Sequence, residues 1–279
     1  MATKKESTEL APVSNFSLVP RYQGMDPEEL AELQDELADL DPESGIACRT
    51  IKIPSGGGLA YEVEGDDEGD VDYKKEIVGV IIFTHRMNGY WPNAFGSGED
   101  GNKAPDCSSM DGKTGVERDS GEVHNCDTCP YNQYGSAVTQ QGDQGRGKAC
   151  KNMRRIYLMM SGDPNVYLLS VPPTSIRDLN KKLAKIMAQG IPYTGLLVSL
   201  KLEKATNTGG IAYSKAVIEK KGILPADVTA AVKQMRAQVK EQYMNMAVTM
   251  DDYTTAQPAD QAGANFEEVT GTDAELPFN

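Results

Sequence analysis

The chain has 279 residues, of which 39% are hydrophobic and 25% are charged, and its formal net charge is −13. This length allows a sizeable buried core, in one elaborated domain or two small ones. No apolar run approaches a membrane span and the N-terminus lacks the apolar core of a signal peptide, so we expect a cytoplasmic protein without a membrane partner.

The charge is segregated along the chain. The net charge is −8 over residues 1–45, −9 over 46–143, +12 over 144–240 and −8 over 241–279. A basic segment inside an acidic protein either neutralises the acidic parts or presents a field to a polyanion. The segregation favours a nucleic-acid partner.

Residues 1–45 form an acidic arm with one predicted helix, from Pro27 to Leu40. Asp26 suits the N-cap and Pro27 the first turn. Leucines at helical spacing make an apolar stripe, which we expect to pack on the body of the protein or on a neighbouring subunit. The stripe consists of Leu30, Leu33, Leu37 and Leu40.

Residues 46–247 have the pattern of a β-rich nucleic-acid-binding domain. Strands are predicted at 46–53, 59–64, 76–84, 154–161, 165–171, 194–204 and 211–220, with a turn at 65–70. Helices are predicted at 174–189, capped by Thr174, and at about 225–246. The fold class is therefore α+β and β-rich, and an OB-like antiparallel barrel with an insertion at 92–150 and flanking helices is the architecture we expect.

Four cysteines in the insertion have the spacing of metal ligands. Cys126 and Cys129 form a Cys-x-x-Cys, and Cys107 and Cys150 lie about twenty residues to either side. The stretch is too polar and too long to order itself, so we predict one structural Zn²⁺ in place of a core. A redox Cys-x-x-Cys would not need the outer pair, and disulfides are rare in the cytosol. Cys48 lies apart, in an apolar run, and is expected to be buried.

His124 is an alternative ligand, because it lies two residues before Cys126 and could replace one of the outer cysteines. A site closed by four thiolates leaves no open position for catalysis. The sequence also lacks the His-x-Glu of nucleotide deaminases, a Walker loop and a Gly-x-Ser-x-Gly. We therefore predict that the protein is not an enzyme.

Cations and aromatic side chains cluster around the insertion, and both are what single-strand binding needs. The predicted phosphate contacts lie around the last cysteine and on the exposed face of the helix at 174–189. They are Arg146, Lys148, Lys151, Arg154, Arg155, Lys181, Lys182 and Lys185. The predicted stacking residues are Trp91, Tyr131 and Tyr134, for which burial is the alternative.

Residues 248–279 form an acidic tail that cannot bury enough apolar surface to fold, so we expect it to be disordered. It ends in the apolar hook Leu276-Pro277-Phe278, preceded by Asp273 and Glu275. This ending resembles the C-terminal tip with which single-stranded-DNA-binding proteins dock replication and repair partners. The resemblance implies partner binding by these five residues, although Asn279 displaces the terminal carboxylate by one position.

A second resemblance covers about residues 90–220. The segments Cys126-Asp127-Thr128-Cys129-Pro130 and Gly147-Lys148-Ala149-Cys150-Lys151 look like the zinc-containing part of a group of bacteriophage single-stranded-DNA-binding proteins. The resemblance implies a zinc-containing OB-fold protein of DNA replication, recombination and repair in the host cytoplasm. Such a protein coats single strands without sequence preference, recruits replication or recombination proteins and can self-associate on DNA. The alternative is a zinc-stabilised regulator that binds duplex DNA.

Overall fold

The computed structural model describes residues 13, 15–19, 25–40, 48–67, 69–92, 104–138, 143–207, 210–244, 246–248 and 252. The described residues form a strand-rich α+β structure, which confirms the predicted class. Its helices are α1 (Pro27–Leu40), α2 (Pro173–Met187) and α3 (Ala226–Tyr243), with the 3-10 turns η1 (Pro130–Asn132) and η2 (Tyr193–Gly195). Its strands are β1 (Arg49–Lys52), β2 (Tyr61–Glu64), β3 (Val71–Lys74), β4 (Glu76–Tyr90), β5 (Cys107–Ser109), β6 (Thr114–Glu117), β7 (Val123–Asn125), β8 (Lys151–Met160), β9 (Tyr167–Val171), β10 (Leu196–Thr206) and β11 (Ala212–Ile223).

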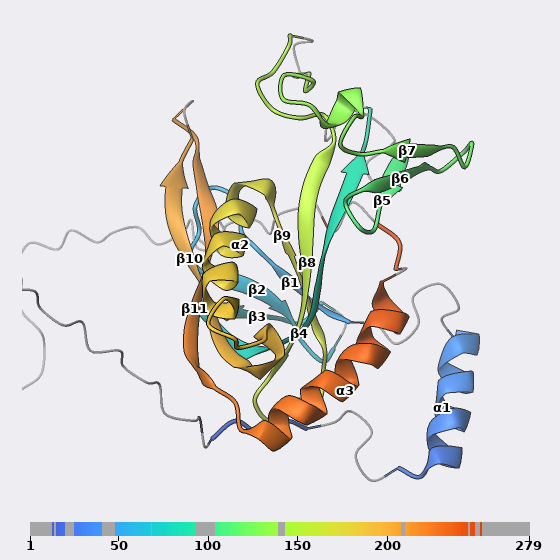
Figure 1. Ribbon diagram of the computed structural model, residues 1–279, viewed down its shortest axis with the longest axis vertical. Coiled ribbons are helices and arrows are strands. Elements are labelled where there is room, and N and C mark those ends of the chain that lie inside the picture. Colours follow the sequence, from blue (N-terminus) through green and yellow to red (C-terminus); the bar gives the residue numbers. More distant parts are fainter. Residues whose placement is uncertain are drawn as a thin grey trace, which may run out of the picture.

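These strands form one mixed sheet (Figure 1). Its order is β3-β2-β1-β9-β8-β4-β5-β6-β7, and β10 joins the first part of β4 and carries β11. All pairings are antiparallel except that of β1 with β9, and among the described residues none joins the outer strands to each other. The described sheet is thus open and mixed, where the sequence predicted an antiparallel barrel. The parallel pair arises because the chain passes through β4 and β8 before β9 returns beside β1.

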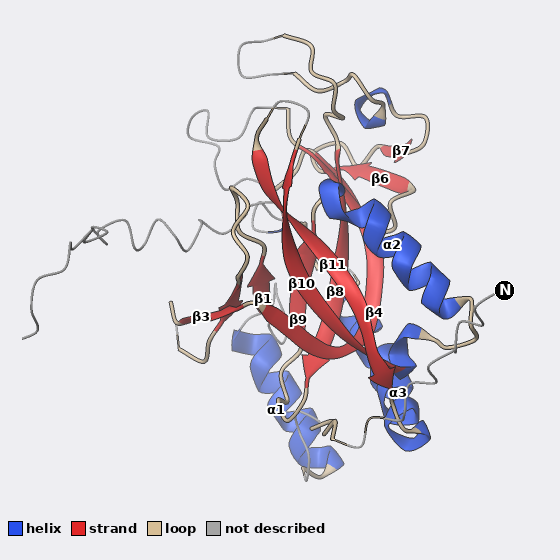
Figure 2. Ribbon diagram, turned by 90° about the vertical axis from the view of Figure 1, so that its left-hand side faces the viewer, coloured by secondary structure: helices blue, strands red, loops and turns tan. Residues whose placement is uncertain are grey.

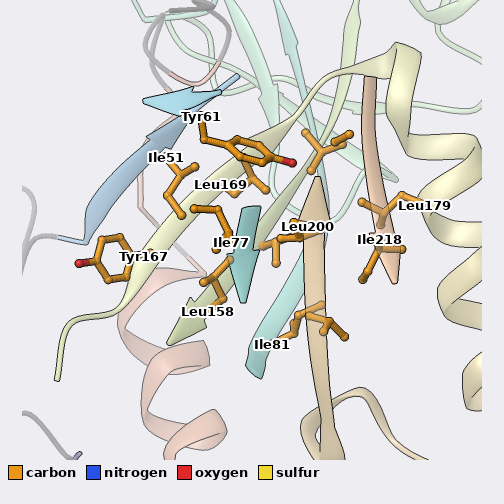
Figure 3. Close-up of a cluster of buried hydrophobic side chains, with 14 of the residues drawn as sticks. Ile51, Tyr61, Ile77, Ile81, Leu158, Tyr167, Leu169, Leu179, Leu200 and Ile218 are labelled. Carbon is orange, nitrogen blue, oxygen red and sulfur yellow. The ribbon is translucent and has the colours of Figure 1, made fainter. Parts of the chain in front are cut away.

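Each face of the sheet is covered by one helix (Figure 1; Figure 2). On one face, α2 contributes Leu179, Leu183 and Ile186 to a cluster that includes Ile156 and Leu158 of β8. Figure 3 shows the centre of this cluster. On the other face, α3 contributes residues such as Val232, Val239 and Tyr243 to a second cluster. We call these the α2 face and the α3 face.

A bulge in β4 changes which residues point to which face. Ile77 and Ile81 lie in the cluster of the α2 face, whereas Ile82 and Phe83 both lie in that of the α3 face. The pairing of β4 with β8 is irregular between Ile81 and Phe83. An extra residue in one strand reverses the alternation of all later side chains. From Thr84 onward, the even-numbered residues of β4 therefore face the α2 side.

Several boundaries differ from the predicted ones. The strand predicted at 76–84 continues to Tyr90, β8 begins at Lys151, and β3 follows the predicted turn. The insertion contains β5, β6 and β7, which its polar composition did not indicate. Thr174 is not the cap of α2, because Pro172 occupies the N-cap position. Ser175, which follows Thr174, is fully buried. Its Oγ accepts a hydrogen bond from the backbone N–H of Ala216 at 2.9 Å, which connects α2 to β11.

Helix α1 begins with the predicted cap. Asp26 Oδ1 accepts the backbone N–H groups of Glu28 and Glu29 at 2.9 Å, and Glu29 Oε2 accepts that of Asp26 at 3.2 Å. Leu30 and Leu33 are half-buried and lie outside the core clusters. The predicted packing of the stripe on the body is therefore not found for these two leucines. None of the described helices has both the length and the apolar character needed to cross a membrane.

The start of the predicted tail is packed against the α3 face. Val248 is buried against Met87 and Met153. The side chain of Asp252 is 4% exposed and that of Arg155 is fully buried. Arg155 Nε donates to Asp252 Oδ1 at 3.0 Å, and its Nη2 contacts Oδ2 at 2.5 Å. The prediction of a tail without packing from 248 onward is therefore wrong for Val248 and Asp252.

Candidate metal centre and nucleic-acid interface

The four predicted metal ligands line one cavity at the end of the sheet where β4 meets β5. Cys107 begins β5, Cys126 and Cys129 lie between β7 and η1, and Cys150 precedes β8. The cavity has a volume of about 330 Å³. A Cβ atom on Gly115 would lie 3.0 Å from Cys107 Sγ and 3.6 Å from Cys126 Sγ, so a glycine here leaves room for both sulfurs.

The chemistry of these thiols fits a bound cation. All five cysteines of the chain are free of disulfides. Burial, followed by the neighbouring cysteines, raises the pKa of Cys107 to about 11 and that of Cys150 to about 12. Without a cation these two thiols stay protonated at neutral pH. Binding of a metal by these sulfurs would require both thiols to lose their protons.

A second group of potential ligands lies beside the cavity, on the hairpin of β6 and β7. The ligand atoms of Glu117, Glu122 and His124 all lie within 4.8 Å of one another, so this group could hold a metal ion. His124 Nε2 lies 2.9 Å from Glu117 Oε1. Glu117 and His124 also line the cavity. The structure thus places His124 next to the cysteines, but in a set of its own with two carboxylates.

The polypeptide around the cysteines forms a module that is attached to the sheet by polar contacts. Asn132 Oδ1 accepts hydrogen bonds from Lys148 Nζ at 3.1 Å and from Asn152 Nδ2 at 2.9 Å. Asn152 also donates to Asn88 Oδ1 at 2.8 Å. We call residues 104–150 the cysteine module. Its last cysteine leads directly into β8, and Asn88 and Tyr90 of β4 line the cavity.

Two predicted stacking residues lie on this module. Tyr134 is 83% exposed, and Lys148 Nζ lies 5.2 Å from the centroid of its ring. Tyr131 is half-exposed and is stacked on Tyr90, with ring centroids 4.3 Å apart. An exposed ring with a cation beside it can stack on a base while the cation meets a phosphate. Tyr134 has the better geometry because one face of Tyr131 is already covered.

Trp91 is placed differently from the prediction. It is half-buried and packs against the small cluster formed by Met87, Met153 and Val248. A Cβ atom on Gly89 would lie 2.6 Å from the Trp91 ring. The indole therefore packs closely on β4 at a position where a side chain larger than that of glycine would clash with it. This packing agrees with burial, the alternative to base stacking that the sequence left open for Trp91.

The two consecutive arginines of β8 point to opposite faces. Arg154 faces the α2 side and is half-buried, whereas Arg155 faces the α3 side and is fully buried. Besides Asp252, Arg155 binds the carbonyl oxygens of Met246 and Ala247 at 2.8 and 2.7 Å. The prediction that Arg155 contacts phosphates is therefore wrong, because alternation along a strand turns only one of two neighbours outward.

The other predicted cations are accessible to different degrees. Arg146 is exposed, and Lys151 is half-buried with its pKa lowered by that burial. On α2, Lys181 and Lys185 are exposed, and Lys182 Nζ lies 3.9 Å from Glu219. Helix α2 covers the same face of the sheet on which Arg154 lies.

Sequence analysis missed Arg86, which lies directly opposite Arg154 in the pairing of β4 with β8. It was missed because the strand was predicted to end at residue 84. The alternation of polar Thr84, Arg86 and Asn88 with less polar residues was the signal that could have extended it.

The partner-binding residues predicted at the C-terminus, Asp273, Glu275, Leu276, Pro277 and Phe278, lie outside the described residues. Comparison with known proteins found no match among family models, curated proteins or solved structures. The site is therefore interpreted from its own geometry.

Proposed function

We propose that this protein binds single-stranded DNA, in the manner of the phage proteins of replication and recombination that its sequence resembles. The observation that carries the proposal is the exposed Tyr134 ring with Lys148 beside it. Both residues belong to the cysteine module, whose last cysteine precedes β8, the strand that carries Arg154. Single-strand binders combine cations that follow the backbone with aromatic faces that stack on bases. The proposal includes no enzymatic role. It does include an OB-like arrangement of the strands.

We also propose that the module is held by one structural Zn²⁺ on Cys107, Cys126, Cys129 and Cys150. Four free thiols around one cavity, two of them in a Cys-x-x-Cys turn, support this assignment. The metal would keep Lys148 and Tyr134 in place by fixing both ends of the segment that carries them. The set of Glu117, Glu122 and His124 is the competing location.

A gel-shift comparison of single-stranded and duplex DNA of equal length tests the function. Tighter binding of the single strand, with little dependence on sequence, is the expected result. Equal affinity for duplex DNA would favour the duplex-binding regulator, and no binding to either would reject a nucleic-acid function.

The variant Tyr134→Ala should weaken binding to single-stranded DNA. Base stacking on an aromatic side chain contributes about 1–3 kcal/mol, so affinity should fall by about 5- to 150-fold. Fluorescence anisotropy with a labelled oligonucleotide measures the change. Tyr73→Ala is the matched control. Tyr73 is 56% exposed on β3, which lies at the opposite end of the sheet order from β5, β6 and β7 of the cysteine module. Equal loss in both variants would contradict a specific stacking role.

The residues after Asp252 are proposed to compete with DNA and to recruit replication or recombination partners. Residues 253–279 carry five carboxylates and no cation. A tethered segment reaches an effective concentration in the millimolar range, and 27 residues can span at most about 90 Å, enough to reach the other face of the sheet. DNA would displace the segment and free Leu276-Pro277-Phe278 for partners.

Removal of residues 253–279 should therefore tighten binding to single strands, most clearly at low salt, where charges are poorly screened. Oligonucleotide titrations at two salt concentrations measure the difference. Phe278→Ala removes the apolar anchor but no charge, so it should abolish partner binding and leave DNA affinity unchanged. Unchanged or weaker affinity after truncation would exclude electrostatic competition.

A further inference from the structure

Arg86 and Arg154 form a like-charged pair across two neighbouring strands. They are directly opposite in the antiparallel pairing of β4 with β8, where side chains on one face are about 5 Å apart at Cβ. Like charges in this position destabilise a sheet. Burial, and to a smaller extent the charge of Arg86, lowers the pKa of Arg154.

No carboxylate compensates this pair in the described part of the chain. Arg49, Arg118 and Arg155 each have an acidic partner within 4 Å, but neither Arg86 nor Arg154 does. Arg154 Nη1 donates to Thr84 Oγ1 at 3.1 Å, while its Nε is buried without a hydrogen-bond partner. A buried guanidinium N–H without an acceptor is costly unless an acceptor comes from outside.

The cysteine module packs against the side chain of Arg86. The turn at Gly112, with φ of 72°, lies against Arg86, and a Cβ atom there would be 2.9 Å from Arg86 Cβ. Only glycine fits such a close approach at positive φ. The cysteine module thus packs on the aliphatic stem of Arg86 and leaves its head exposed. The next pair on the same face of these strands is Asn88 and Asn152, which are hydrogen-bonded to each other. Asn152 also donates to Asn132, which accepts a hydrogen bond from Lys148.

We propose that Arg86 and Arg154 together bind one phosphate group of the nucleic-acid strand, and that this phosphate supplies the missing counter-charge. The pair suits an anion because guanidinium forks match phosphate oxygens. It lies on the α2 face of β4 and β8. The inference rests on the proposed function for the source of the phosphate, but its anion chemistry can be measured independently.

The test uses the full-length protein and the double variant Arg86→Gln, Arg154→Gln. With a single-stranded oligonucleotide, the double variant should bind about tenfold more weakly at low salt. The slope of log affinity against log salt should become shallower by about 0.7, the value for one lost phosphate contact. The matched control is Arg49→Gln on β1, whose guanidinium is already paired with Asp66 in the turn between β2 and β3. It should change neither quantity.

Inorganic pyrophosphate separates this inference from the proposed function. It should raise the thermal midpoint of the wild type and of Arg49→Gln, but not that of the double variant. The double variant alone should be at least as stable as the wild type without ligand, since it removes repulsion. If the wild type responds to pyrophosphate through this pair but binds no oligonucleotide, the anion site stands and the proposed function fails. Unchanged oligonucleotide affinity and salt slope in the double variant, or an equal response to pyrophosphate, would overturn the inference and leave the function intact.

Discussion

Asp252→Ala should destabilise the protein by about 3–5 kcal/mol, the usual effect of removing one partner of a buried ion pair. Arg155 would remain fully buried without its counter-charge, and Ser170 Oγ would lose the acceptor that it contacts at 2.7 Å. The change is measured as the difference in the free energy of unfolding in urea. Glu241→Ala is the control, because it removes an exposed carboxylate near the end of α3.

Two truncations test the same contact without a new side chain. Removal of residues 249–279 should destabilise the protein, whereas removal of 253–279 should not, although the two differ by only four residues. Coincident unfolding curves for the two truncations would contradict a structural role for the Arg155–Asp252 pair. Experiments on tail competition therefore require the shorter deletion, because the longer one changes stability and charge together.

Replacement of Cys126 and Cys129 by Ser should abolish metal binding and disorder the cysteine module. Elemental analysis should show one zinc per chain in the wild type and none in the variant. The loss of Tyr134 and Lys148 from their places should weaken single-strand binding at least tenfold, since one stacked base alone contributes about 1–3 kcal/mol. The clusters that α2 and α3 form on the sheet contain none of the four cysteines, so the main unfolding transition should persist.

His124→Ala distinguishes the two candidate metal locations. It should retain zinc if four cysteines bind the metal, and lose zinc if His124 is a ligand, either with three cysteines or with Glu117 and Glu122. Limited proteolysis between residues 104 and 150 provides a readout that does not depend on DNA. Full zinc retention in the double cysteine variant would reject the four-cysteine assignment.

Local sequence signals predicted the elements whose cause is local. The cap of α1 follows from Asp26 and Glu29, whose side chains need only the first turn of the helix. The cysteine spacing predicted one site for four thiols, and all four line one cavity, although the described group with ligand atoms close enough to hold a metal ion is Glu117, Glu122 and His124. Seven strands and all three described helices were also found near their predicted positions, because hydrophobic patterns indicate them, whereas β3, β5, β6 and β7 were not predicted.

Long-range contacts decided what the sequence pattern left open. Asp252 belongs by composition to an acidic tail, but it is buried because Arg155 lies 97 residues away in sequence and beside it in space. Residue 155 was predicted as a phosphate contact for the same reason that 154 was, namely its charge. Only the pairing of β8 with its neighbours shows which of the two faces outward.

The sequence by itself determined the strand-rich class, the segregated charge and the cysteine spacing, since each depends on residue type and order alone. The tertiary structure decided the composition of the interface. Alternation from Ile77 and Ile81 would place the odd-numbered residues of β4 on the α2 face, but the bulge before Phe83 places Arg86 there, opposite Arg154. A bulge is set by the partner strand, so the alternation within β4 does not by itself show that Arg86 lies on the α2 face opposite Arg154.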